Sequence, residues 1–404
     1  MESSQTAALG IWCAVGSRHE SARQTGLSHF LEHLLFKGTQ KRSARQISEE
    51  IEGVGGDLNA YTAEERTCFY ATAAYDHISG VTEVLCDMYS NSRLDAQEVE
   101  RERGVIFEEI EMIRDEPAQH VQELLTAETW QGSSLGRPIT GTKKTLSSIS
   151  RKDLFGHLRR NYNANRTIVT AAGAVNHREF VKLVEEFLNG LPSQPSRLKV
   201  NLPARQTAPR LVIEERDTQQ TQLALSFRAF GSHSHRRYAV NLLNIILGGN
   251  MSSRLFQELR ERRGLCYSIS SSLSTHSDCG AFEISLGLDG KNVSKALQLI
   301  LKECRKIAQK GPTLDELLRA RDYSIGSSRI ALERASTQNH RLGTSLLIYD
   351  KVFTPEYLYD RLAKVTQAEI QTAAKMILQN QNLCLAMVGN GPDREELLSV
   401  IRSS

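Results

Sequence analysis

The stretch His29-Phe30-Leu31-Glu32-His33 brings two imidazoles and a carboxylate together within five residues. On a helix, residues four apart lie on one face, so His29 and His33 would lie side by side with Glu32 next to them. Two neutral imidazoles on one face can hold a zinc ion, and Glu32 would then take a proton from a water that the metal activates. The alternative interpretation is a surface helix on which these three side chains have no chemical role.

A catalytic zinc site usually has three protein ligands and a water, so the two histidines need a third partner. An acidic helix, predicted from about residue 96 to residue 114, is the natural source. Glu102 and Glu109 are two turns apart and share a face of this helix, whereas Glu108 is rotated away by about 100°. We choose Glu109 as the third ligand and Glu102 as its neighbour. His120 is an outside candidate for ligand, which we expect to be an ordinary helix histidine.

The glutamate face of the acidic helix is expected to point inward, because Val105, Ile106 and Met112 flank it. A carboxylate inside a protein is costly unless a metal or another partner compensates its charge. The alternative is a solvated acidic face, which we expect for Glu98, Glu100 and Glu108.

Length and composition restrict the classes of protein to consider. The 404 residues are enough for two domains, and 40% apolar with 24% charged residues is typical of a globular protein. A net charge of +3 gives no support to a nucleic-acid-binding module or a membrane partner. No apolar run approaches the ~20 residues of a membrane span, and the N-terminus lacks the pattern of a secretory signal. Seven cysteines without paired spacing suit a reducing compartment, so we expect a cytoplasmic protein.

A proline-rich segment divides the chain. Residues 191–210 contain four of the nine prolines, and we interpret them as an interdomain linker. The expected domains are therefore residues 1–190, with the histidine motif, and residues 211–404.

The second domain repeats the order of the first. A predicted strand from Ala7 to Val15 ends at Gly16-Ser17, and one from Leu223 to Phe230 ends at Gly231-Ser232. Similar elements follow each strand, which indicates a duplicated domain. The copy has lost the metal motif, because residues 244–248, opposite the histidine helix, read Asn-Ile-Ile-Leu-Gly. Only the first domain can hold zinc in this way.

The chain resembles the pitrilysin and insulin-degrading type of zinc peptidase, in particular its short branch related to mitochondrial processing peptidase. The run from Gly26 to Thr39, Gly-Leu-Ser-His-Phe-Leu-Glu-His-Leu-Leu-Phe-Lys-Gly-Thr, is close to the signature of that family, which is the inverted form of the zinc-peptidase helix motif. So is the run from Glu102 to Ile110. In the family the third ligand lies on such a helix, and matching the motif gives Glu109.

The resemblance extends to the second half. The run from Leu247 to Phe256, followed by Gly264-Leu265-Cys266-Tyr267, is similar to the family. An arginine and a tyrosine at this spacing help active members to bind substrate and stabilise the transition state, and they match Arg260 and Tyr267 here. Such groups can donate hydrogen bonds to a developing oxyanion and to the peptide backbone. Without the resemblance, a surface role for Arg260 would be the better interpretation.

The run from Gly56 to Ala60 matches the family's substrate-facing edge strand. An extended peptide can add to such an edge through main-chain hydrogen bonds, with Asn59 and Ala60 contacting its backbone. The alternative is a protected sheet edge. The family usually has another strand before the one that begins at Ala7, so we expect either a trimmed or misassigned start or a missing edge strand.

These observations together predict an α+β fold of two related domains, each an antiparallel sheet covered by helices, as in half of the family's clamshell. We expect a zinc endopeptidase in which His29, His33 and Glu109 hold one Zn²⁺ per chain. Glu32 is the expected general base, and Glu102 is expected to support catalysis beside the metal. Extended or unfolded peptides are the expected substrates.

The resemblance also implies how the protein assembles. Longer family members have four such domains around a chamber, so a chain of two domains can rebuild this arrangement as a homodimer. Each active site would then be completed in trans by Arg260 and Tyr267 of the other copy. The alternative is a non-catalytic or regulatory partner subunit of a heterodimeric processing peptidase.

Overall fold

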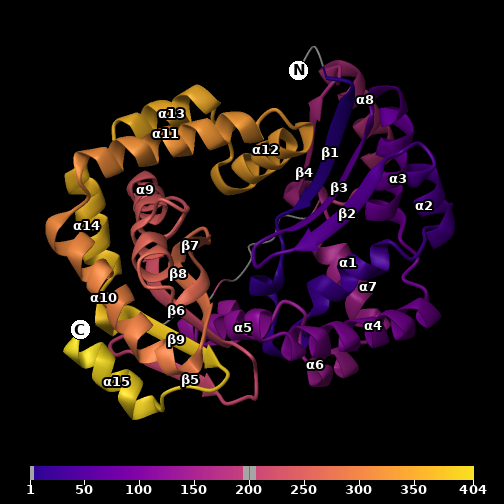
Figure 1. Ribbon diagram of the computed structural model, residues 1–404. Helices are drawn as coiled ribbons and strands as arrows, with labels where there is room; N and C mark the ends of the chain where they lie inside the picture. The colour runs from indigo at the N-terminus through magenta and orange to yellow at the C-terminus, as the bar shows by residue number, and fades with distance from the viewer. Residues whose placement is uncertain (1–3, 194–199, 201–205) are drawn as a thin grey trace. The chain divides into compact units, whose positions relative to one another are not determined.

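The computed structural model describes residues 4–193, 200 and 206–404, which form two compact α+β units (Figure 1). Unit 1 comprises Met1–Glu111, Arg137–Leu202 and Arg329–Val352. Unit 2 comprises Met112–Gly136, Pro203–Ser328 and Phe353–Ser404. The predicted fold class, two related halves built on sheets and helices, is confirmed.

The units differ from the predicted ranges 1–190 and 211–404 in two segments. Residues 112–136 belong to unit 2 although they precede the predicted linker, and residues 329–352 belong to unit 1 although they follow it. Most of the linker itself lies outside the described residues. Each unit therefore contains a helical segment from the other half of the chain.

The sheet of unit 1 has the strand order β2-β3-β1-β4, with antiparallel pairing throughout. Its strands are β1 (Thr6–Cys13), β2 (Asp57–Thr62), β3 (Thr67–Ala74) and β4 (Thr167–Gly173). β2 pairs with β3 alone, so it forms one edge of the described sheet.

Helices cover both faces of this sheet. They are α1 (Leu27–Leu35), α2 (Ala44–Glu52), α3 (Ile78–Asn91), α4 (Ala96–Asp115), α6 (Lys143–Ser148), α7 (Arg151–Asn161), α8 (His177–Leu188) and α12 (Ala335–Tyr349). Because side chains alternate along a strand, Leu9 and Ile11 of β1 point to one face, where they join the core beneath α1. Gly10 and Trp12 point to the opposite face, which α12 covers.

The contact between α12 and β1 is tight and polar at its centre. The indole Nε1 of fully buried Trp12 donates to the Thr170 Oγ1 over 2.8 Å, and the Thr170 hydroxyl donates to the Asn339 Oδ1 over 2.6 Å. Gly343 of α12 lies directly against the indole, where a Cβ atom would be 1.9 Å from the ring. This glycine lets the helix approach the sheet.

Unit 2 repeats the plan on a larger sheet with the order β5-β9-β6-β8-β7, antiparallel except where β5 meets β9. Its strands are β5 (Arg210–Glu214), β6 (Thr221–Phe230), β7 (Cys266–Thr275), β8 (Cys279–Leu288) and β9 (Leu383–Val388). Its helices are α5 (Pro117–Thr129), α9 (Arg237–Leu247), α10 (Val293–Lys310), α11 (Leu314–Ala331), α13 (Pro355–Ala363), α14 (Gln367–Ile377) and α15 (Arg394–Ser403). Val121 and Leu125 of α5 pack on Ala224 and Ala386 of this sheet, as α12 packs on the sheet of unit 1.

Within the part of the chain that the structure describes, none of the helices combines the length and the apolar character needed to cross a membrane.

The glycine contact predicts a stability difference. Gly343→Ala should lower the free energy of unfolding by about 1–3 kcal/mol, because the new methyl overlaps an indole that has no room to move. The control is Gly80→Ala in α3, where nothing lies within 4 Å of the new atom. That change should raise the stability by about 0.5–1 kcal/mol, as alanine favours helix over glycine. Urea titrations give both values, and equal stability of the two variants would contradict this packing.

Candidate metal centre

α1 and α4 bring two imidazoles and a carboxylate to one point in unit 1. The Nε2 atoms of His29 and His33 both face Glu109, at 3.7 Å from its Oε1 and Oε2 respectively. One ligand atom from each of these three residues lies within 4.8 Å of the other two, and the described residues contain no other such group of three metal-ligating side chains. The structure thus brings together the three predicted ligands.

The spacing of these atoms fits zinc. A tetrahedral zinc ion with bonds of about 2.1 Å separates its ligand atoms by about 3.4 Å. The distances of 3.7 Å between each Nε2 and the carboxylate are close to this value. Two imidazoles and one carboxylate also leave a fourth position, as a catalytic zinc site requires.

The protonation states also suit a metal. Burial lowers the pKa of His29 to about 3, with a smaller contribution from neighbouring His33. This imidazole is therefore neutral near pH 7 and has a free lone pair. Burial also raises the pKa of Glu109, an effect that His33 opposes. A cation at this point would compensate the cost of holding the carboxylate away from water.

Glu102 holds His33 from the side away from Glu109. Its nearly buried carboxylate contacts the His33 Nδ1 at 3.2 Å and the Lys37 Nζ at 2.8 Å. A carboxylate partner on Nδ1 fixes the imidazole tautomer and leaves Nε2 free for a metal. The sequence indicated Glu102 as a neighbour of the site, but it gave no sign of Lys37.

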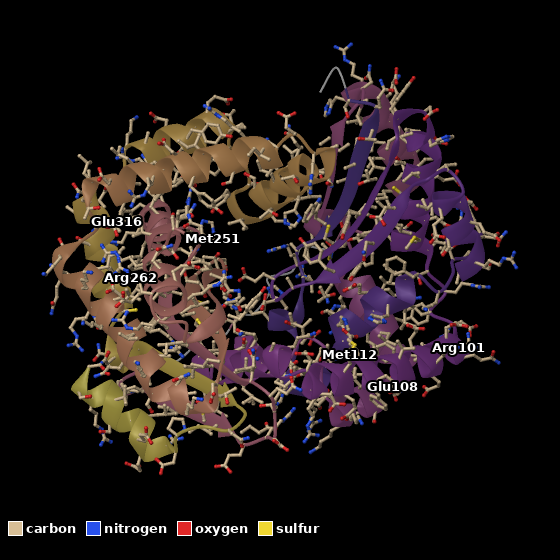
Figure 2. The ribbon with its side chains drawn as sticks, viewed as in Figure 1. Arg101, Glu108, Met112, Met251, Arg262 and Glu316 are labelled. Atoms are coloured by element: carbon tan, nitrogen blue, oxygen red, sulfur yellow. The ribbon has the colours of Figure 1, made fainter. Side chains whose placement is uncertain are left out.

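The prediction of which residues of α4 point inward was partly wrong. Ile106 is buried as predicted, but Val105 is 46% exposed and Met112 is 59% exposed. The buried positions of this helix are Val99, Glu102 and Ile106, a spacing of three and four residues that follows the helical period. Val105 is rotated off that stripe by about 100°. Figure 2 shows Met112 and the exposed Glu108 on this helix.

His120 takes no part in the metal group. It lies on α5 in unit 2, where its Nε2 contacts the Glu214 Oε2 at 2.8 Å. The expectation of an ordinary helix histidine agrees with this pairing.

Glu32 is buried beside the two histidines on α1. Its Oε2 accepts a hydrogen bond from the Thr62 Oγ1 over 2.5 Å. Burial raises the pKa of Glu32, although the bond from Thr62 opposes the shift. A carboxylate with a raised pKa is better suited to accept and return a proton near neutral pH.

The N-terminus of α1 is held by a carboxylate that sequence reasoning missed. The buried Glu20 accepts hydrogen bonds from the backbone N–H groups of Gly26 and Ser28 over 2.8 and 2.6 Å. These are orphan donors at the positive end of the helix dipole, where a carboxylate is favourable. Gly26 has a φ of 95°, which favours glycine, and its Cβ would lie 2.7 Å from the Thr140 carbonyl. The cap fixes the helix that carries both histidines.

Asn59 and Ala60 lie on the edge strand β2. The side chain of Asn59 is exposed, and its Oδ1 accepts a hydrogen bond from the Ala60 N–H over 2.8 Å. This N–H is therefore not part of the ladder to β3, and it faces the open edge of the sheet.

Arg260 and Tyr267 are neighbours in unit 2. The Arg260 guanidinium lies 5.3 Å from the centre of the Tyr267 ring and 4.6 Å from that of Phe256. Arg260 belongs to a short π-helix, Phe256–Glu261, a form that is frequent at functional sites. Tyr267 lies at a register shift at the start of β7 and is 77% exposed. The predicted pair is thus brought together and presented to solvent.

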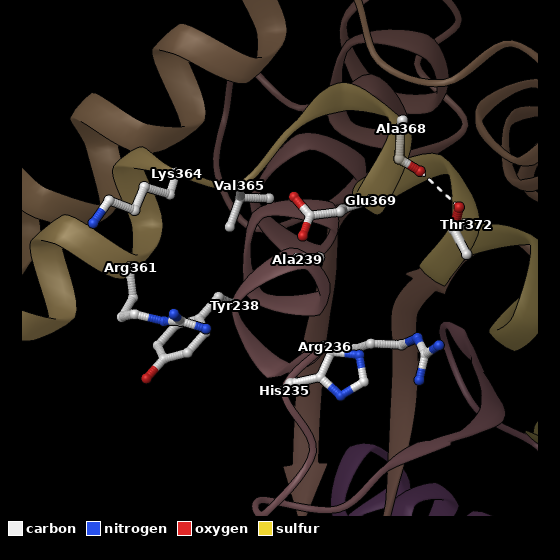
Figure 3. Close-up of a pocket in the computed structure, with 10 residues that line it drawn as sticks. All are labelled: His235, Arg236, Tyr238, Ala239, Arg361, Lys364, Val365, Ala368, Glu369 and Thr372. Carbon is white, nitrogen blue, oxygen red and sulfur yellow. Dashed lines mark hydrogen bonds between the residues drawn. The ribbon is translucent and has the colours of Figure 1, made fainter.

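Unit 2 also has an open pocket of about 340 Å³ (Figure 3). Its lining includes the basic residues Arg236, Arg361 and Lys364, of which Lys364 pairs with Asp360. Its one carboxylate, Glu369, accepts a hydrogen bond from the backbone N–H of the residue that caps α14. The pocket has no metal-ligating group of the kind found in unit 1.

Comparisons with known proteins agree with this chemistry. Residues 1–143 match the profile described as Insulinase (Peptidase family M16), and residues 148–323 match Peptidase M16 inactive domain. A Streptomyces coelicolor protein named as an uncharacterized zinc protease is 35% identical over 98% of this chain and 87% of its own length. One with the same description from Bacillus subtilis is 33% identical over 96% of this chain and 95% of its own.

Two solved structures share the fold. One is titled as a peptidase M16 inactive domain from Pseudomonas fluorescens, with a TM-score of 0.89 at 20% identity. The other is titled as a protease from Helicobacter pylori, with a TM-score of 0.89 at 18% identity. Each comparison covers 97% of this chain and 94% of the other.

The geometry predicts a graded loss of zinc. Glu102→Gln should weaken zinc binding about 10- to 100-fold, since it loosens the partner of a ligand. Glu109→Gln should weaken it more, because it removes a charged ligand, whereas Glu108→Gln on the exposed face should bind normally. Competition with a chromogenic chelator measures all three affinities. Normal binding by Glu109→Gln would show that this site does not hold the metal.

Proposed function

This chain belongs to the insulinase family of peptidases, family M16, and on that premise we propose that it is a zinc-dependent endopeptidase. The observation that carries the proposal is the group formed by His29, His33 and Glu109, with the buried Glu32 beside it. These four side chains are the ligands and the base that such a reaction needs.

The chain's own residues divide the work of hydrolysis. Bound zinc would act as a Lewis acid toward the peptide carbonyl and lower the pKa of a water toward ~7. Glu32 takes a proton from the attacking water at its carboxylate and passes it to the leaving amide nitrogen. Glu102 keeps His33 in the tautomer that leaves Nε2 unprotonated.

The substrate is an extended peptide that adds to the open edge of β2. The Ala60 N–H faces this edge, and Asn59 beside it has an exposed side chain that can rotate to contact a peptide backbone. Strand addition would replace the local bond between the Ala60 N–H and the Asn59 side chain with a main-chain hydrogen bond to the peptide. Unfolded peptides are therefore substrates, and compact folded proteins are spared.

In this proposal, unit 1 provides the metal centre and the base, and unit 2 provides the groups that stabilise the substrate. The profile named as inactive covers residues 148–323, which lack a counterpart of the histidine motif but include Arg260 and Tyr267. We assign this pair the role of hydrogen-bond donors to the substrate and the developing oxyanion. A closed two-fold homodimer, with each site completed in trans, supplies the pair to the metal centre.

A non-catalytic partner subunit is less well supported. Such a protein has no need of a complete ligand set, whereas this chain has both histidines, the third ligand and the base. We also propose a reducing compartment such as the cytoplasm, since the seven cysteines, all within the described residues, form no disulfide.

The Glu32→Gln variant should lose peptidase activity without losing bound zinc. Wild-type protein should cut an unstructured peptide and stop when a chelator is added. Glu32→Gln should lose about 10²- to 10⁴-fold in kcat, the usual contribution of a general base, while it retains one zinc per chain. Peptide digestion followed by mass spectrometry, with zinc measured in the same samples, tests both. Cleavage by Glu32→Gln at the wild-type rate would remove it as the base.

Subunit mixing tests assembly in trans. His33→Ala and Tyr267→Phe should each be inactive alone. After subunit exchange, a hybrid dimer has one intact site and one doubly damaged site, so about a quarter of the wild-type activity should return. Exchange is followed with two affinity tags. If hybrids form and the mixture stays inactive, the sites are not built in trans.

A further inference from the structure

We propose that Thr62 is a positioning residue that fixes the orientation of the Glu32 carboxylate. The inference rests on the proposed peptidase function, in which Glu32 is the base. It starts from one short contact, since the Thr62 Oγ1 donates to the Glu32 Oε2 over 2.5 Å. Among the described residues, Thr62 is the one hydrogen-bond donor to this carboxylate.

The strand geometry explains why Thr62 reaches Glu32. Thr62 is the last residue of β2, and side chains two apart on a strand share a face. Leu58 and Ala60 of this strand pack against the core beneath α1. Thr62 therefore points to the side of the sheet on which α1 presents Glu32.

The turn that follows Thr62 is held firmly by another part of unit 1. The carbonyl oxygens of Ala63 and Glu64 accept hydrogen bonds from the N–H groups of Ser17 and Arg18 over 3.2 and 2.8 Å. Gly16 allows this approach, because a Cβ there would lie 2.0 Å from the Ala63 oxygen. The backbone that carries the Thr62 hydroxyl is therefore held in place.

An ion pair adds to the contacts between this turn and the segment that contains Ser17 and Arg18. The buried Arg18 guanidinium contacts the Glu65 Oε1 at 2.6 Å. Within the turn, the Ala63 N–H donates to the Arg66 carbonyl over 2.8 Å. Three consecutive residues after Thr62, Ala63 to Glu65, are thereby tied to the loop that leads into α1, and Arg66 closes the turn on Ala63.

The hydrogen bond from Thr62 gives the two carboxylate oxygens of Glu32 different roles. An ionised carboxylate only accepts hydrogen bonds, and one with a hydroxyl donor is short and strong. Oε2 of Glu32 is committed to Thr62, so Oε1 is the oxygen left for a water. Without this bond the side chain can rotate about its own torsions, and a misplacement of about 1 Å can cost about 100-fold in rate.

The arrangement also couples the base to the substrate. Thr62 lies two residues after Ala60, on the same edge strand that would take the peptide. A single strand therefore sets both the register of the bound peptide and the orientation of the base. A hydroxyl whose only role was to donate a hydrogen bond to a buried carboxylate would not have to lie on the strand that binds the peptide.

The test compares variants of Thr62 in the zinc-loaded protein. Thr62→Val, which keeps the shape and removes the donor, should lower kcat about 10- to 100-fold. KM and zinc per chain should not change. Thr62→Ser should restore most of the rate, and Thr62→Ala serves as a second donor-free variant if the valine variant folds poorly. The control is Thr72→Val on β3, whose side chain lies on the opposite face of the sheet and should have no effect.

A double-mutant cycle gives the sharpest discrimination. In a Glu32→Gln background, Thr62→Val should cause no further loss, because the group that it positions is gone. An equal loss in both backgrounds, a failure of serine to restore the rate, or a loss of zinc in Thr62→Val would each overturn the positioning role. Unimpaired Thr62→Val would overturn it as well, while leaving the peptidase function intact. A wild-type protein without chelator-sensitive cleavage would overturn both.

Discussion

The carboxylate of Glu109 and the imidazoles of His29 and His33 are held with their ligand atoms within 4.8 Å of one another in unit 1. A carboxylate partly shielded from water is costly unless a cation balances it, and burial raises the pKa of Glu109 accordingly. Burial also keeps His29 neutral by lowering its pKa to about 3. A divalent metal bound there would balance this charge, and the surrounding contacts hold the three side chains in place.

Those contacts are polar ties that fix the two helices and the edge strand. Glu20 caps α1, which carries both histidines, and Glu102 of the neighbouring helix α4 contacts His33 and Lys37. Thr62 ties Glu32, the proposed base, to the edge strand. Each tie orders a group that packing alone would leave free to rotate, as a preorganised site requires.

Local spacing placed His29 beside His33 and Glu102 beside Glu109, because residues of one helix follow its period. Spacing placed Glu102 and Glu109 on one face, the resemblance singled out Glu109, and the repeated order of elements indicated two related domains. Val105 was misassigned because hydrophobicity alone does not say which side of a stripe is buried. The contact of Thr62 with Glu32 and the crossing of residues 329–352 into unit 1 depend on tertiary packing between distant segments, which periodicity does not encode.

The measurement that tests the central claim most directly is the X-ray absorption spectrum of the zinc-loaded protein at the zinc edge. We expect one zinc per chain with nitrogen and oxygen neighbours at about 2.0–2.2 Å, including the scattering pattern of two imidazoles. A sulfur shell at about 2.3 Å would contradict the account, because it would place the metal on one of the seven cysteines.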